Sequence, residues 1–281
     1  MLELFSHQFI QYAFIAGTLI AVICAIVGYF VVLRAQAFAA ESLSCVGFTG
    51  ATGAAVFGLS SLSGTVLFTL LVALGFGLFG KRLKGRDIEV GMVLSFALGL
   101  GVLFLKLYTS NATEAVGILF GSILSVTTGD LYLSLITGIL ALSVLAFIFR
   151  PLLFASIDPE VAEARGVPVQ LLGVIFMVLV GITIAEAILV VGVLLVFALL
   201  IAPAATAQHL SNRPITALLL SVALGLGFVW GGMVLGLLLH VPVSFFIAAL
   251  AAVSYLIAAP LVHFVSPHLY APQPHGGREI S

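Results

Sequence analysis

The chain has 281 residues, of which 62% are hydrophobic and only 7% are Asp, Glu, Lys or Arg. Soluble domains carry about 25% charged residues, so this composition excludes a water-covered globular surface and predicts an all-α polytopic membrane protein. The formal net charge is −1, and the chain has no basic patch of the kind that binds nucleic acid, so we expect no nucleic-acid partner.

Apolar runs long enough to cross a bilayer of about 30 Å predict about nine transmembrane helices, with eight as the alternative. The runs are residues 9–33, 36–59, 62–80, 88–108, 130–150, 169–185, 187–208, 215–239 and 242–264. Only the short stretch 183–186 divides the sixth run from the seventh. We expect residues 1–281 to form a single transmembrane domain, with a disordered tail at 266–281.

The basic residues predict the orientation of the chain. With the N-terminus outside and nine spans, nine of the ten Lys and Arg residues lie on the cytoplasmic side, and only Lys106 lies near the outer side. The C-terminus is then cytoplasmic. The N-terminal stretch has no basic region and no small-residue cleavage site, so we expect no removed signal peptide. Both cysteines lie in apolar runs, and we expect no disulfide framework.

Two segments between the spans are informative. The run 115–126 is apolar but too short to cross, so we expect a re-entrant or interfacial helix on the outer side. The loop 154–168 is the longest polar cytoplasmic loop. In this loop Asp158 can cap a short helix, Pro159 suits its first turn and Gly166 can end it, which predicts a helix of one or two turns.

The candidate metal-binding residues lie in the first two spans. Glu41 and Cys45 are one turn apart on the second span, about 8 and 13 Å from its cytoplasmic end, and Cys24 lies at about 13 Å in the first span. An ionisable residue inside a span is read as functional, and a set with thiols favours zinc over manganese. For Cys24, plain packing is the alternative. Glu186 and Glu114 are expected near the outer surface, either solvated or admitting cations.

Several absences limit the function. The sequence has no GxxxxGK[ST] phosphate loop, no HExxH and no GxSxG, so we do not expect an enzyme. If ATP drives transport through this chain, a separate partner chain hydrolyses it.

Four stretches in order, at residues 30–50, 118–126, 156–168 and 190–207, resemble the permease subunit of the bacterial zinc/manganese ABC transporter family, also called the ABC-3 family. The resemblance implies a homodimer in the bacterial plasma (inner) membrane, with a cytoplasmic ATP-binding subunit on each permease. An extracytoplasmic metal-binding protein would deliver the ion. The loop that contains Asp158, Pro159, Glu160, Ala164 and Gly166 would be the coupling helix that meets the ATPase.

The chain departs from the family pattern at one pair of positions. The family commonly has Asp and His, associated with the metal path, where this chain has Glu41 and Cys45. Both replacements keep a metal-binding group, and the thiol is the softer one. We therefore expect an ATP-driven importer of Zn²⁺, with Mn²⁺ as the alternative and no permanently bound cofactor. The alternative function is a self-sufficient carrier or channel that exchanges a proton at Glu41, but the loop 154–168 then has no docking role.

Overall fold

The computed structural model describes residues 8–79, 87–108, 117, 119, 121, 126–239 and 241–265. These residues form helices and no strands, which confirms the predicted all-α class. The helices are α1 (Gln8–Leu33), α2 (Ala37–Val56), α3 (Ser61–Leu78), α5 (Asp87–Tyr108), α7 (Thr128–Ile157), α8 (Pro159–Ala164), α9 (Val169–Val191), α10 (Val193–Leu210), α11 (Pro214–Leu239) and α12 (Val243–Val265).

Eight of the described helices are long and apolar enough to cross a membrane. The remaining long helix is α2, whose hydroxyl groups, glycines and Glu41 lower its hydropathy. Of its 20 residues, 14 are buried. Because its neighbours shield it from lipid, α2 can be polar where the other long helices are not.

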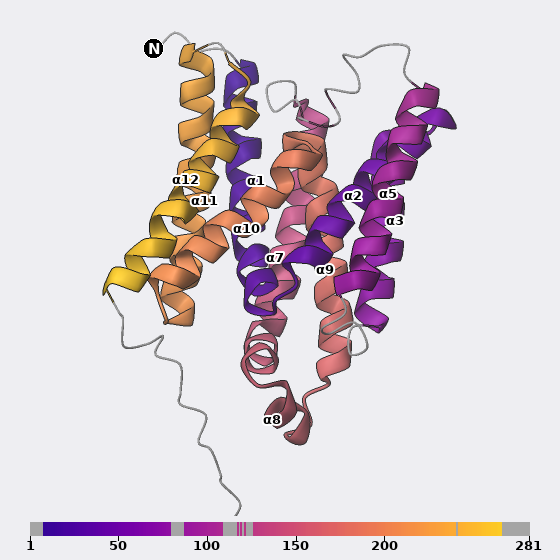
Figure 1. The fold of residues 1–281 in the computed structure, drawn as a ribbon. Coiled ribbons are helices and arrows are strands. Elements are labelled where there is room, and N and C mark those ends of the chain that lie inside the picture. Colours follow the sequence, from indigo (N-terminus) through magenta and orange to yellow (C-terminus); the bar gives the residue numbers. More distant parts are fainter. Residues whose placement is uncertain are drawn as a thin grey trace, which may run out of the picture.

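The long helices run alternately in opposite directions, so α8 lies at the opposite end of the bundle from the start of α1 (Figure 1). Helices α2, α3 and α5 pack together on one side, and α10, α11 and α12 pack together on the other. Helix α9 joins the two groups, because it contacts α1, α2, α3, α7 and α10. The core residues with the largest buried side chains include Phe30, Phe48 and Phe176.

Two of the predicted boundaries are wrong. Helix α7 does not end at residue 150 but continues to Ile157 with Pro151 inside it. A proline removes only one backbone donor, and a helix packed among neighbours tolerates it. The break between α9 and α10 lies at Gly192, not at 183–186. Gly192 has φ +82°, a left-handed conformation that glycine adopts at little cost, and no polar residue marks the place.

Several predicted features lie outside the described residues. They are most of the outer segment 115–126, Glu114, the basic cluster at 81–86 and the tail 266–281. Within the outer segment, Gly121 is described and packs against the backbone of Val191 and Gly192. This contact places Gly121 next to the α9–α10 break.

Candidate metal path and coupling surface

Hydroxyl groups fix α2 between the helices on either side of it. Ser42 Oγ donates to the carbonyl oxygen of Val90 in α5 at 3.5 Å. Thr49 Oγ1 donates to the carbonyl of Ala97, also in α5. On the other side Ser44 Oγ donates to the carbonyl of Val193 in α10 at 3.1 Å. These bonds set the rotation of α2, and with it the direction in which Glu41 and Cys45 point.

Glu41 is half-buried, and its Oε2 is sealed from solvent with no hydrogen-bond partner among the described residues. Cys45, one turn further along α2, is 6% exposed, and the Glu41 carboxylate lies close enough to act electrostatically on its thiol. Buried polar atoms normally have partners, so this oxygen is free to take a ligand. A carboxylate and a thiol are both donors for transition metals.

Cys24 lies elsewhere. It is fully buried in the main core on α1, where the titratable group that acts on it is Glu186 of α9 and not Glu41. Cys45 belongs to a separate small cluster with Val46 and Ala97. In the described part of the chain no group of three or more His, Cys, Asp or Glu could hold a metal. Cys24, at the same expected depth as Cys45, therefore does not join Glu41 and Cys45 in one metal-ligand group within this chain. Both thiols are free, and no disulfide joins them.

The short helix α8 has the local structure that its sequence predicts. The Asp158 side chain accepts a hydrogen bond from the backbone N–H of Val161 at 3.0 Å, and Pro159 occupies the first turn. Gly166 follows with φ +81°. Ala162 is fully buried, which ties α8 to the bundle, while Glu160 and Ala164 are exposed. Helix α8 protrudes from the end of the bundle (Figure 1), as a docking element must.

Arg34 connects the start of α2 with the helices that flank α8. Its Nη1 donates to Ser156 Oγ in the last turns of α7 at 3.4 Å, and its guanidinium lies 5.6 Å from the ring centroid of Phe176 in α9. The next residue, Ala35, takes φ +53° as the chain turns into α2. From the sequence, Arg34 was expected to mark the cytoplasmic end of the first span, which gives the orientation of the chain and the depths of Glu41 and Cys45. An arginine at the end of an apolar run, directly before the metal candidates, was the signal for this second role.

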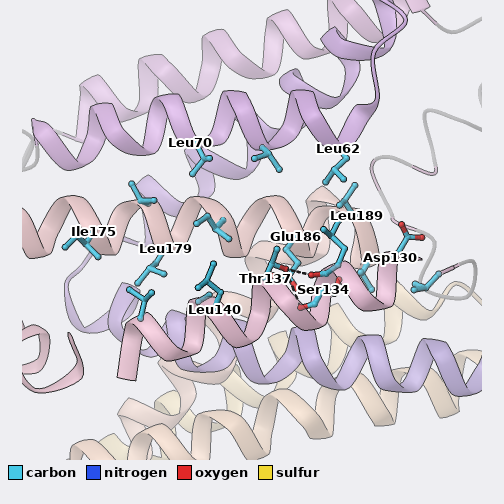
Figure 2. A pocket seen from close by; sticks show the side chains of 18 of the residues that line it. Leu62, Leu70, Asp130, Ser134, Thr137, Leu140, Ile175, Leu179, Glu186 and Leu189 are labelled. Carbon is cyan, nitrogen blue, oxygen red and sulfur yellow. Dashed lines mark hydrogen bonds between the residues drawn. The ribbon is translucent and has the colours of Figure 1, made fainter. Parts of the chain in front are cut away.

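Glu186 is the functional candidate that the sequence placed wrongly. Because α9 continues to Val191, Glu186 lies inside that helix and is 6% exposed. Figure 2 shows its side chain pointing from α9 toward Ser134 and Thr137 of α7. Both hydroxyls lie within hydrogen-bonding reach of the carboxylate, and the Thr137 hydroxyl also lies 2.8 Å from the carbonyl oxygen of Leu133. Glu186 is therefore buried and not solvated at the outer surface.

Comparisons with known proteins agree with this architecture. The model of the ABC 3 transport family matches residues 6–261. The manganese transport system membrane protein MntC of Halalkalibacterium halodurans is 32% identical over 79% of this chain and 77% of its own length. The manganese import system permease protein ScaB of Streptococcus gordonii is 31% identical over 94% of both chains.

A solved structure shows the same fold. A chain of PsaBC from Streptococcus pneumoniae, in complex with Fab, superposes with a TM-score of 0.79 at 29% identity, over 90% of this chain and 91% of that one. The family match covers nearly the whole chain, including α2, α8 and α9. The chain therefore belongs to the ABC 3 transport family, as a membrane-spanning permease of the ABC transporter type.

Proposed function

We propose that this chain forms the translocation path of an ATP-driven importer of a divalent transition metal. The observation that carries the proposal is the buried Oε2 of Glu41, which has no hydrogen-bond partner among the described residues. Glu41 lies one helical turn from Cys45 on α2, a polar helix with 14 of its 20 residues buried. A carboxylate in such a place is expensive without a partner, and a passing cation supplies one. The names of the relatives, a manganese transport system membrane protein and a manganese import permease, support a metal cargo.

Two observations point to different ions. The relatives are named for manganese, whereas the Cys45 thiol is a soft donor that suits zinc better than manganese. We propose Zn²⁺ as the preferred cargo, because the thiol belongs to the site of this chain itself, and Mn²⁺ as the second candidate. One carboxylate and one thiol per chain bind an ion weakly and transiently. That suits a path, since a closed four-ligand zinc site would trap its ion.

The partners in this proposal are a second copy of the permease, a cytoplasmic ATP-binding subunit and an extracytoplasmic metal-binding protein. The docking surface for the ATP-binding subunit is α8 with the residues at its two ends. Its residues are Asp158, Glu160, Ala164 and Gly166, which are exposed, and the half-buried Pro159. In this proposal α8 is cytoplasmic and the N-terminus lies outside.

ATP binding to that subunit moves α8 and, with it, the flanking helices α7 and α9. Arg34 contacts both of those helices just before α2 begins. It therefore passes their movement to the helix that carries Glu41 and Cys45. Hydrolysis resets the pair of permeases, and the ion is released inside.

The test is ATP-dependent uptake of radiolabelled zinc and manganese into proteoliposomes that contain the whole complex. We expect uptake of zinc in preference to manganese, and a loss of about tenfold or more in Glu41→Gln and Cys45→Ala, as for removing a transition-metal ligand or its direct support. Cys24→Ala serves as the matched control, because the Cys24 thiol lies in the packed core. The complex with this variant should still take up metal.

Three results would contradict the proposal in different ways. Normal uptake in both the Glu41→Gln and Cys45→Ala variants would remove the metal path from α2. Preference for manganese would leave the path in place and reject zinc. Uptake by the permease alone, driven by a proton gradient without ATP, would favour the self-sufficient carrier.

A further inference from the structure

A groove about 650 Å³ in volume lies between α3, α7 and α9, away from the proposed metal path. Helices α3 and α7 pack on α9 from two sides, so α9 forms the floor (Figure 2). One stripe of groove-lining residues on α9 runs through Ile175, Val178, Ile182, Glu186 and Leu189, spaced three or four residues apart as on one helix face. Glu186 is the only polar member of that stripe.

The two walls of the groove, on α3 and α7, are also mainly aliphatic. The α3 wall is aliphatic, with Leu62, Val66 and Leu70 half-buried. The α7 wall is aliphatic except near Glu186, where the hydroxyls of Ser134 and Thr137 face the carboxylate (Figure 2). Ligand sites are typically concave and apolar with a few polar groups that fix orientation, and their volumes run from about 300 to 1,000 Å³. The groove has this form.

Among the described residues, the polar end of the groove offers no cation. The carboxylates of Glu186 and, nearer the start of α7, Asp130 line it, and no described Lys, Arg or His does. Glu186 is more than nine-tenths buried. Its polar neighbours are the neutral hydroxyls of Ser134 and Thr137 (Figure 2), and no cation among the described lining residues balances its charge. A buried carboxylate left in this state is costly, and an ammonium group that donates two or three charge-assisted hydrogen bonds would satisfy it.

The length of the apolar part limits the other end of the ligand. Ile175 lies eleven residues before Glu186 on α9, which is about 16 Å at 1.5 Å per residue. An extended aliphatic chain of about twelve carbons covers that distance.

We propose that this groove binds a long-chain aliphatic amine, with its ammonium group on Glu186 and its chain along α9 toward Ile175. The site is separate from Glu41 and Cys45, so the proposal does not depend on which ion the permease carries. Ser134 and Thr137 lie beside the head group and favour a small primary ammonium over a bulky quaternary one, because they accept hydrogen bonds that a quaternary head cannot donate.

The experiment measures equilibrium binding of radiolabelled dodecylamine and dodecanol to the full chain in nanodiscs. The nanodiscs are made of phosphatidylcholine, because this lipid has no primary amine. Partition into empty nanodiscs is subtracted. We expect dodecylamine to bind the unaltered chain at least tenfold more tightly than it binds Glu186→Gln, the loss expected for one charge-assisted contact. Dodecanol should bind both proteins equally, and this equality also shows that Glu186→Gln keeps the fold of the groove.

A second variant tests the groove independently of the carboxylate. Ile182→Trp fills the middle of the groove and keeps Glu186, so both dodecylamine and dodecanol should lose binding. Equal affinity of dodecylamine for the unaltered chain and for Glu186→Gln would overturn the proposal, because the groove would then take apolar chains without regard to the carboxylate. Undiminished dodecylamine binding in Ile182→Trp would overturn it too, since the amine would then bind elsewhere.

Discussion

The close approach of α2 to α3 depends on two glycines that face each other, and Gly50→Ala tests it. A methyl group on Gly50 would lie 2.8 Å from the carbonyl carbon of Gly64 and 2.9 Å from Cβ of Phe68, and closer still to the Gly64 carbonyl oxygen. These are backbone or near-backbone atoms that cannot rotate away. The two helices must therefore separate, and α2 moves together with Glu41 and Cys45.

The magnitude follows from two opposing terms. Replacing a helical glycine by alanine stabilises a helix by roughly 0.5–1 kcal/mol, whereas overpacking a close interface costs about 1–3 kcal/mol. Gly75→Ala on α3 is the matched control, because a methyl group there would meet no atom within 4 Å. The free energies of unfolding of the two variants should therefore differ by about 1–3 kcal/mol, with Gly50→Ala the less stable.

The assay is denaturant unfolding of the purified permease in one detergent, followed by metal uptake in the assembled complex. Gly50→Ala should unfold at lower denaturant than Gly75→Ala and should also transport more slowly, because its α2 is displaced. Equal stabilities would show that α2 and α3 do not approach each other closely at Gly50 and Gly64. Equal stability together with normal uptake would refute the inference that the glycines set the position of the metal path.

Three further predictions concern coupling and selectivity. Asp158→Ala removes the N-cap of α8, which contributes about 1 kcal/mol, and should weaken co-purification of the ATP-binding subunit. The control Asp87→Asn, at the start of α5, should leave co-purification unchanged. Unchanged co-purification of Asp158→Ala would mean that the ATP-binding subunit does not dock on α8. Arg34→Gln keeps a donor for Ser156 but loses the charge over Phe176, so uptake should fall while ATP hydrolysis persists, and a parallel fall of both would contradict a coupling role. Cys45→His replaces a soft donor by a harder one, so the ratio of zinc to manganese uptake should fall; a ratio that does not move would show that Cys45 does not select the ion.

The class of the protein and most of its helices follow from the sequence alone. A span of about 20 apolar residues can satisfy its backbone in lipid only as a helix, so hydropathy, which is local, places α1, α3, α5, α11 and α12 to within a few residues. The cap of α8 is equally local, because Asp158, Pro159 and Gly166 act within two turns of each other. The loop with these residues also resembles the ABC-3 family in sequence, and the family model matches residues 6–261, which include it.

The contacts between helices could not be obtained in this way. Depth along a helix placed Cys24 level with Cys45, but depth does not fix which face of α1 meets which neighbour. The packed bundle puts Cys24 in the main core and Cys45 in a separate small cluster. The break at Gly192 depends on one backbone angle within an uninterrupted apolar run, where hydropathy carries no signal. Glu186 therefore looked like a surface residue, and only the packing of α3 and α7 on α9 shows it to be buried at the end of an apolar groove. Apolar periodicity decides which segments enter the membrane, whereas side-chain volume and the rotation of each helix decide which residues meet there.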